Sequence, residues 1–238
     1  MEKKKLEILC TICARGGSKG VYSKNIKNIN GRPLISYTIR QAKKAGVFSA
    51  IVVSTDSKKI SNVAKKYGAH SWFLRPKKYA SDRSAKLPAI KHAFQQSEKY
   101  FKKKFDIIMD LDTTSPLRNI RDITKSLATF RASKYKNLVS ISSSKKNPYF
   151  NMIEKKFDKK YDIVKKFKKK LTRRQDTPKV YDINASIYIW SRKSILNQKK
   201  IITSQTGAYL MPSERSIDID SYLDWKIVEF LLKKKDDL

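Results

Sequence analysis

Short apolar runs alternate with amphipathic stretches over most of this chain, and this alternation limits the folds that it can adopt. The runs are rich in isoleucine and valine and nearly continuous in apolar character, as in strands buried on both faces. Strands are predicted at residues 6–13, 50–54, 106–110, 138–142 and 185–190. Helices are predicted at residues 34–45, 58–67, 88–101, 120–132 and 222–234. The pattern predicts an α/β fold, with a mainly parallel sheet covered by helices on both sides.

The turn after the first predicted strand is rich in glycine and positive charge. It reads Cys13-Ala-Arg-Gly-Gly-Ser-Lys-Gly20 and is followed by Lys24 and Asn25. Its glycines allow positive φ and a close approach of backbone amides to an anion, while Arg15, Lys19 and Lys24 add cationic donors. The spacing matches neither a Walker A loop nor a dinucleotide-binding glycine motif. We expect this loop to hold a polyphosphate; a basic surface turn is the alternative.

Two acidic segments follow further along the chain. The first, Asp110-Leu-Asp-Thr-Thr-Ser-Pro-Leu-Arg118, comes after a predicted strand, and the second, Ser216-Ile-Asp-Ile-Asp220, alternates acidic and aliphatic residues. In the strand period Asp218 and Asp220 should share one face, and such a pair of carboxylates suits Mg²⁺ beside a phosphate. Alternatively, the first segment only caps a turn and the second only caps the last helix.

Ligands of open parallel sheets bind beyond the carboxyl ends of the strands. Residues 15–20, 55–56 and 111–118 all follow predicted strands, so we expect them to lie on one rim. Arg75 and the pair Ser81-Asp82 lie between a strand and a helix. Arg75 could fork onto a base or a phosphate, but an exposed surface arginine is the simpler interpretation.

The alternation stops after the fourth predicted strand. A stretch rich in lysine and aromatic residues leads to Arg173-Arg-Gln-Asp-Thr-Pro178 and then to the strand predicted from residue 185. We predict a core formed by residues 1–143 and 184–238, with an insertion at residues 144–183 that could extend through 200–215. The insertion is expected to act as a lid over the site, as a dimerisation element, or as both.

The formal net charge of the chain is +33. A nucleic-acid-binding surface would be one-sided, whereas here lysines occur over every predicted surface, so we expect a solvated exterior and no nucleic-acid partner. No apolar run approaches the ~20 residues of a membrane helix. Since the amino terminus also lacks the pattern of a secretory signal, we expect a cytoplasmic protein without membrane contact.

The two cysteines, Cys10 and Cys13, stand three positions apart on a predicted strand. Their side chains should point to opposite faces of the sheet, which argues against a disulfide or a shared metal ion. We therefore predict reduced cysteines that serve in packing.

A glycine-rich cationic loop, two acidic segments and a basic insertion together indicate nucleotidyl transfer. This chemistry depends on positioning the reactants and on neutralising charge at the α-phosphate. We find no serine–histidine–aspartate arrangement, reactive cysteine or histidine acid–base pair in the sequence that competes with this interpretation.

In motif order and spacing, nearly the whole chain resembles the cytidylyltransferases that activate sialic acids and related nonulosonic acids. The resemblance is carried by residues 14–25, 31–35, 53–56, 75–76, 80–82, 114–118, 184–185 and 216–220. It implies a Rossmann-like, three-layer α/β/α nucleotide-diphospho-sugar transferase fold, a homodimer and a requirement for Mg²⁺. It also implies the reaction CTP + nonulosonic acid → CMP-nonulosonic acid + pyrophosphate, in which the anomeric hydroxyl attacks the α-phosphorus directly.

The resemblance also implies a role for each matching residue. Those that would carry catalysis are Arg15, Lys24, Asp218 and Asp220. Those that would hold the triphosphate, cytosine and ribose of CTP are Arg15, Gly16, Gly17, Ser18, Lys24, Asn25, Arg75, Ser81 and Asp82. Those that would meet the sugar acid are Asp112, Thr114, Ser115, Arg174, Gln175 and Asn184. The carboxylates that would bind Mg²⁺ are Asp218, Asp220 and Asp112.

Departures from the sialic acid pattern favour one subgroup of this family. Asp112 stands where sialic acid enzymes often have glutamine, and Asp182-Ile183 replaces the usual arginine before Asn184. Segments such as Asn147-Pro-Tyr-Phe-Asn-Met152 look most like the subgroup that activates N,N'-diacetyllegionaminic acid for bacterial surface glycans. Enzymes for sialic or pseudaminic acid are the near alternatives, and a nucleic-acid-binding protein or a catalytically inactive relative are alternatives of another class.

Overall fold

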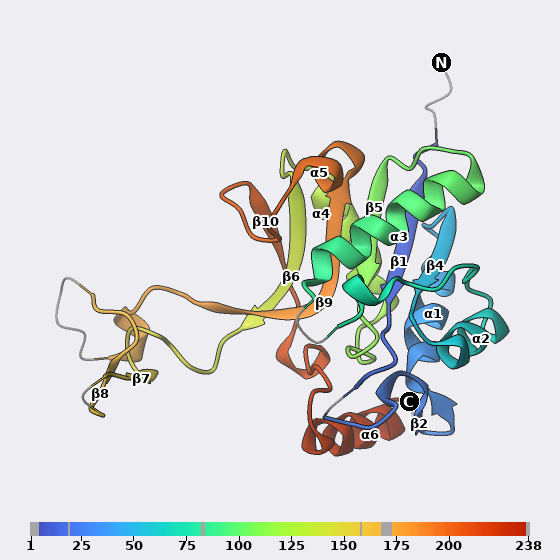
Figure 1. Cartoon of the computed structure of the whole chain (residues 1–238). Helices are drawn as coiled ribbons and strands as arrows, with labels where there is room; N and C mark the ends of the chain where they lie inside the picture. The colour runs from blue at the N-terminus through green and yellow to red at the C-terminus, as the bar shows by residue number, and fades with distance from the viewer. Residues whose placement is uncertain (1–4, 19, 82–83, 158, 168–172, 237–238) are drawn as a thin grey trace.

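The structure is a computed structural model that describes residues 5–18, 20–81, 84–157, 159–167 and 173–236. Lys19 and Asp82, two of the residues expected around the nucleotide, lie outside the described residues. A central sheet with helices packed against it forms the body of the molecule, and a narrow extension projects from one side (Figure 1).

The central sheet has six strands. Their order is β10 (Thr206–Leu210), β6 (Asn137–Ser143), β9 (Tyr181–Ser191), β5 (Ile107–Leu111), β1 (Ile8–Cys13) and β4 (Ala50–Ser54). β9 runs antiparallel to both of its neighbours, and the other neighbouring pairs are parallel. The mainly parallel sheet predicted from the apolar runs is confirmed. Since β5, β1 and β4 are parallel neighbours, their carboxyl ends meet at one edge.

Helices cover both faces of this sheet and complete the three predicted layers (Figure 1). The helices of one face are α1 (Leu34–Ala45), α2 (Lys58–Lys66) and α4 (Ile120–Arg131), and those of the other are α3 (Lys86–Phe101) and α5 (Arg192–Asn197). Ile39, Ile60 and Ile123 belong to a buried cluster with Cys10 on the first face. Phe94 packs into a separate cluster on the second face.

The two cysteines lie on opposite faces of the sheet, as predicted. Cys10 belongs to the buried cluster under α1 and α2, whereas Cys13 packs against the cluster under α3. Both thiols are free.

The last helix, α6 (Tyr222–Asp236), packs at the carboxyl edge of the sheet. Its Trp225 and Val228 are buried in a third cluster, which also contains Val21 of the loop after β1 and Ile219. Nearby lie a small hairpin, β2 (Asn28–Ile29) and β3 (Arg32–Pro33), and the 3-10 turn η1 (Lys24–Ile26). The cluster therefore holds the glycine-rich loop and the second acidic segment against the same helix.

A salt bridge anchors the chain ahead of the second acidic segment. α4 begins with a capping box, in which Asn119 and Asp122 exchange hydrogen bonds with each other's backbone amides. Asp122 is fully buried and also accepts two hydrogen bonds, each 3.0 Å long, from Arg215. Arg215 ends the 3-10 turn η4 (Ser213–Arg215), so this fork fixes the position from which residues 216–220 depart.

The structure differs from the prediction where packing overrides the local pattern. β9 begins at Tyr181 because it continues along the end of β6 after an irregularity in register, and Ala185 has a φ of +54° at that point. α5 and β10 were not predicted, because both are short, α5 is mostly polar and β10 lacks a run of isoleucine and valine. α3 begins two residues before the predicted start, since a proline is tolerated in the first turn of a helix.

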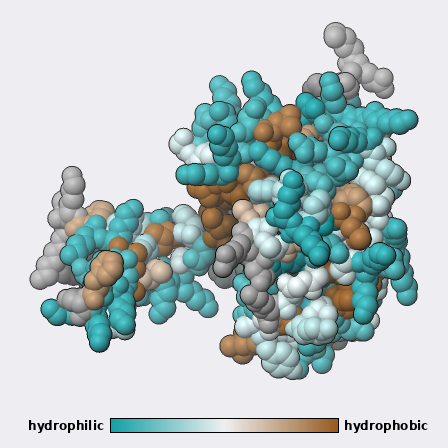
Figure 2. Space-filling view, viewed as in Figure 1, coloured by the Kyte–Doolittle hydropathy of each residue, from teal (hydrophilic) through white to brown (hydrophobic). Residues whose placement is uncertain are grey.

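The extension is the segment between β6 and β9. It carries a two-stranded hairpin, β7 (Ile153–Lys155) and β8 (Tyr161–Ile163), and the 3-10 turn η3 (Arg174–Asp176). Ile153, Phe157 and Tyr161 are all largely exposed, and hydrophobic residues show among hydrophilic ones on this arm in Figure 2. In Figure 1 the arm points away from the sheet and its helices. A role of this insertion as a lid stays a prediction.

None of the helices in the described part of the chain is long and apolar enough to cross a bilayer.

Candidate active site

A cavity of about 470 Å³ opens at the carboxyl ends of the parallel strands, and we call it the main cavity. It is lined by Cys13, Arg15, Ser18, Gly20, Lys24, Asn25, Arg75, Tyr79, Ser81, Ser84, Ala85, Lys86, Ala89, Asp112, Thr113, Thr114, Asp218 and Asp220. The rim predicted from the strand ends is thus brought together, with cationic groups from the loop after β1 and carboxylates from two distant segments.

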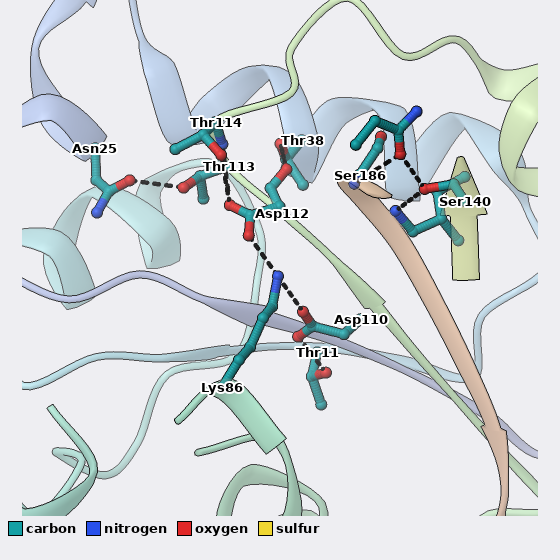
Figure 3. A network of polar contacts seen from close by, with 12 residues as sticks. Thr11, Asn25, Thr38, Lys86, Asp110, Asp112, Thr113, Thr114, Ser140 and Ser186 are labelled. Carbon is teal, nitrogen blue, oxygen red and sulfur yellow. Dashed lines mark hydrogen bonds and ion pairs between the residues drawn. The ribbon is translucent and has the colours of Figure 1, made fainter. Parts of the chain in front are cut away.

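The glycine-rich loop is held by hydrogen bonds to its neighbours. Gly16 N donates to Asp56 Oδ1 over 2.8 Å, and Asn25 Nδ2 donates to the carbonyl of Arg15 over 2.9 Å. Asn25 Oδ1 in turn accepts from Thr113 Oγ1 over 2.6 Å, which ties the loop to the segment after β5 (Figure 3). These hydrogen bonds hold the described part of the loop around Arg15 and Gly16 in position.

No described glycine of this loop has positive φ, so that part of the prediction is wrong. The glycines with positive φ are Gly31, Gly46 and Gly68 among the residues that the structure describes. A Cβ on Gly20 would stand 1.9 Å from the carbonyl oxygen of Asp220, whereas one on Gly17 would meet nothing within 4 Å. Gly20 is required because the loop touches the second acidic segment there.

Lys24 links the same two segments. Its ammonium hydrogen-bonds the carbonyl oxygen of Ile219 and lies 3.5 Å from Asp220 Oδ1. The Lys24 side chain is largely buried, while that of Asp220 is mostly exposed. Lys24 thus presents its charge inside the main cavity at the boundary between its cationic and acidic sides.

Arg75 is buried, so the simpler interpretation of it as a surface arginine is wrong. Its Nε donates to Ser54 Oγ over 3.0 Å, one terminal nitrogen donates to the carbonyl of Ser54, and the other lies 3.4 Å from the carbonyl of Tyr79. These contacts fix the guanidinium at the end of β4, where it lines the main cavity. Ser81 lines the same cavity nearby.

The second acidic segment keeps the predicted alternation without forming a strand. Ile219 is fully buried and its amide donates to Thr114 O over 3.0 Å, while the flanking Asp218 and Asp220 line the main cavity. Burial, together with the charge of Asp112, raises the pKa of Asp218 to about 6. Its Oδ1 is buried and has no hydrogen-bond partner among the described residues. Asp218 is therefore a carboxylate that a nearby cation would stabilise.

Lys86 is the prominent residue of the main cavity that the sequence interpretation missed. Its ammonium lies 3.2 Å from Asp110 Oδ2, forms an ion pair with Asp112 Oδ2, and lies 4.5 Å from the ring centre of Tyr188 (Figure 3). Burial favours the neutral amine, but the carboxylates of Asp112 and Asp110 raise the pKa of Lys86 above its usual value. The missed helix start at residue 86 hid this position within an expected loop.

Asp112 combines the cap that was considered for it with a second contact. Its Oδ1 accepts from the amide and the hydroxyl of Thr114, over 3.1 and 3.0 Å, and its Oδ2 faces Lys86. Burial opposes its ionisation, but the charge of Lys86 and these hydrogen bonds lower the pKa of Asp112 to about 2. Thr114 lines the main cavity, whereas Ser115 is fully buried behind it.

Besides the buried Ser115, three residues expected at the sugar acid do not line the main cavity of this chain. Arg174 and Gln175 lie on the extension and line a separate surface cavity of about 640 Å³. Asn184 is buried between β6 and the acidic segment, where its amide donates to Ser216 Oγ over 2.9 Å and accepts from Ser140 Oγ over 2.6 Å. For these residues a contact with the sugar acid stays a prediction.

The three carboxylates expected at Mg²⁺ are not gathered into one cluster. Among the residues that the structure describes, no three histidine, cysteine or acidic side chains come together in a way that could hold a metal ion. Asp112 is engaged by Lys86 and Asp220 lies beside Lys24, while Asp218 keeps one oxygen without a partner. Asp218 is thus the carboxylate with an oxygen still available to a cation.

A glycine-rich loop, buried cationic side chains and carboxylates at the edge of a parallel sheet define a nucleotide-binding protein of the α/β class. The family model for cytidylyltransferase matches residues 9–235. The chain therefore belongs to the cytidylyltransferase family, whose members are nucleotidyltransferases.

Curated relatives and a solved structure are similar over almost the whole chain. Post-translational flagellin modification protein B of Campylobacter coli is 47% identical over 229 residues, which are 96% of both chains. CMP-N,N'-diacetyllegionaminic acid synthase of Campylobacter jejuni is 46% identical, again over 96% of both. The structure of CMP:2-keto-3-deoxy-manno-octonic acid synthetase complexed with CTP covers 96% of this chain and 99% of its own, with a TM-score of 0.70 at 14% identity. This last likeness confirms the fold.

Proposed function

We propose that this protein transfers CMP from CTP to the anomeric hydroxyl of N,N'-diacetyllegionaminic acid and releases pyrophosphate. The observation that carries the proposal is the main cavity, which joins cationic groups for a triphosphate to carboxylates for a metal and a sugar. The acceptor is inferred from the relative that is 46% identical and is named for that sugar. The proposed reaction supplies an activated sugar for bacterial surface glycans, and the cytoplasm is the compartment that we predict for it.

The cationic side of the main cavity suits the nucleotide. Arg15 and Ser18 of the glycine-rich loop line it together with Lys24, so that amides and charged donors can meet phosphate oxygens there. Arg75 and Asn25 lie deeper and are held by backbone carbonyls, so they suit a cytosine or a ribose that must be recognised in one orientation. In the proposed complex Gly16, Gly17 and Ser81 complete these contacts.

The proposed step is a direct in-line displacement. The anomeric oxygen of the sugar forms a bond to the α-phosphorus, the bond to the bridging oxygen of pyrophosphate breaks, and the hydroxyl proton passes to solvent or to a nearby base. Arg15 and Lys24 would offset the charge that develops on the phosphate oxygens and the leaving group. Most of the rate enhancement would then come from positioning and from this charge compensation.

A divalent cation fits the acidic side of the main cavity. Asp218 has a buried oxygen without a partner, and Asp220 follows on the same side of the segment. Mg²⁺ is commonly held by one or two carboxylates together with substrate phosphates, so Asp218 and Asp220 are the residues that we propose for it, with Asp112 more remote because Lys86 engages it. When bound, the ion would neutralise phosphate charge and help to align the triphosphate.

We also propose a homodimer in which the extension packs against a second copy. An isolated two-stranded hairpin is marginally stable in water, and Ile153, Phe157 and Tyr161 expose apolar surface on it. A second copy would cover this surface. It could also bring Arg174 and Gln175 to a neighbouring main cavity, which would account for their place outside the cavity of their own chain.

Pyrophosphate release tests the proposed function. The protein is incubated with CTP, Mg²⁺ and, separately, N,N'-diacetyllegionaminic, N-acetylneuraminic, pseudaminic and 3-deoxy-manno-octulosonic acids. We expect release with the legionaminic derivative in preference to the others. Turnover of none of the four would reject the enzymatic function, and a preference for another acid would reject the proposed acceptor.

A further inference from the structure

The position of Lys86 in the fold is electrostatically unfavourable for a lysine, which suggests a function for its charge. It is the first residue of α3, a helix of 16 residues, and the amino end of a helix carries partial positive charge. The amino end of α3 therefore gains nothing from this ammonium. Its side chain is only 22% exposed and stands in the lining of the main cavity.

The surroundings of Lys86 are built for its charge. Asp110 is fully buried, and its Oδ1 accepts from Thr11 Oγ1 over 2.8 Å while its Oδ2 faces the ammonium. Asp112 faces the ammonium from the other side, and the ring of Tyr188 lies on a third. Figure 3 shows the lysine reaching between the two carboxylates. Burial raises the pKa of Asp110, whereas the pKa of Asp112 is lowered to about 2, so the ammonium chiefly offsets the charge of Asp112, the carboxylate of the two that lines the main cavity.

This charge balance matters for an acidic acceptor. A nonulosonic acid carries a carboxylate, and an unpaired Asp112 in the same cavity would repel it at low effective dielectric constant. Asp112 paired with Lys86 is instead a fixed acceptor for the hydroxyl or amide hydrogens of the sugar. Its orientation is set by Thr114 on one oxygen and by Lys86 on the other.

On the basis of the proposed function, we propose that Lys86 is a positioning residue for the acceptor, which acts by neutralising and orienting Asp112. Lys86 does not touch the nucleotide in this proposal, because the cationic groups that line the nucleotide side come from the loop after β1 and from Arg75. The expected signature is a defect in the use of the sugar acid that is not shared by CTP.

The test compares steady-state kinetics of Lys86→Gln with those of the wild type, varying CTP and the acceptor in turn. Removing one partner of a buried ion pair leaves the other unpaired, so we expect the KM for the acceptor to rise about tenfold or more while the KM for CTP stays within about twofold. Lys99→Gln, at an exposed position of the same helix, should leave both constants unchanged. Equal effects on both substrates, or no effect on the acceptor, would overturn the role of Lys86.

A double variant distinguishes action through Asp112 from direct contact with the sugar. If Lys86 acts through Asp112, then Asp112→Asn in the Lys86→Gln background should recover part of the lost acceptor affinity, because no unpaired carboxylate remains. A double variant with lower acceptor affinity than Lys86→Gln would overturn the mechanism.

Lys86→Arg, which keeps the charge, should retain more acceptor affinity than Lys86→Gln, and a thermal melt of each variant reports whether it is folded. Wild-type protein that turns over no sugar acid would reject the proposed function itself, whereas an active wild type with an unaffected Lys86→Gln rejects this inference alone.

Discussion

The main cavity and the extension differ in how their side chains are held within the chain. Around the cavity, Arg75, Asn25 and Asp112 are buried or partly buried, and each is held by hydrogen bonds to the backbone or to other side chains. On the extension, Phe157 and Tyr161 are exposed, and the hairpin packs on its own two strands.

This difference separates two kinds of function in one fold. Buried polar groups that are hydrogen-bonded within the chain, such as Arg75 and Asn25, are held in position by those bonds. An arm with exposed apolar side chains gains its stability from whatever covers it. Substitutions around the cavity should therefore change catalysis or folding, whereas substitutions on the arm should change assembly.

The largest effect is expected at Asp218. Asp218→Asn should lower kcat by roughly 10²-fold or more, because the loss of one preorganised electrostatic group at a charged transition state costs that order of rate. Pyrophosphate release at saturating Mg²⁺ measures it. The control is Asp106→Asn. Asp106 directly precedes the amino end of β5, opposite the end that lies at the main cavity, so this variant should keep wild-type turnover. Near-normal turnover of the Asp218 variant would place the cation elsewhere.

Gly20 tests whether the loop and the acidic segment work as one unit. A methyl group at this position would meet Asp220 O at 1.9 Å, so Gly20→Ala must push the two segments apart. We expect kcat/KM for CTP to fall about tenfold or more, since small displacements of positioning groups are costly. Gly17→Ala is the comparison variant, because its methyl group would meet no protein atom within 4 Å and can act only through contact with the nucleotide. Equal behaviour of the two variants would contradict the close packing at Gly20.

Substituting one phenylalanine in each region compares how the two regions contribute to stability. Phe94 of α3 is fully buried, so Phe94→Ala should lower the free energy of unfolding by about 3–5 kcal/mol. Phe157 is exposed, so Phe157→Ala should leave unfolding of the single chain nearly unchanged and instead weaken self-association. Chemical denaturation measures the first effect and sedimentation velocity at several concentrations the second. A large loss of stability from Phe157→Ala without a change in association would contradict the proposed dimer contact.

The smallest expected effect is a change of stability with pH. It arises outside the extension, which contains no histidine. Burial, with the nearby charges of Arg75 and Lys78, lowers the pKa of His92 below its usual 6.5. The unfolded chain then binds the proton more readily, so the contribution of neutral His92 to stability is present above pH 6.5 and decreases as the pH falls through that value. The melting temperature of wild type should therefore fall more between pH 7 and pH 5.5 than that of His92→Gln. Parallel melting curves would show that His92 does not titrate with folding.

The sequence alone determined the architecture and the position of the site. Periods of two and of about 3.6 residues are local signals, and the continuous apolar strands required cover on both faces. Parallel strands then placed the glycine-rich loop and the acids after β5 on one edge, which the main cavity confirms. The alternation of Asp218 and Asp220 with buried aliphatic residues was likewise evident from the order of residues.

Only the tertiary structure decided which charges meet. Lys86 and Asp112 are far apart in sequence, and no local period predicts that an ammonium at the start of α3 lies between the carboxylates of β5. Burial of Arg75 depends on hydrogen bonds to Ser54 at the end of β4, and the need for glycine at position 20 depends on the carbonyl of Asp220, 200 residues later. Local patterns determine secondary structure, whereas charge pairing and close approach depend on distances that exist only in the folded chain.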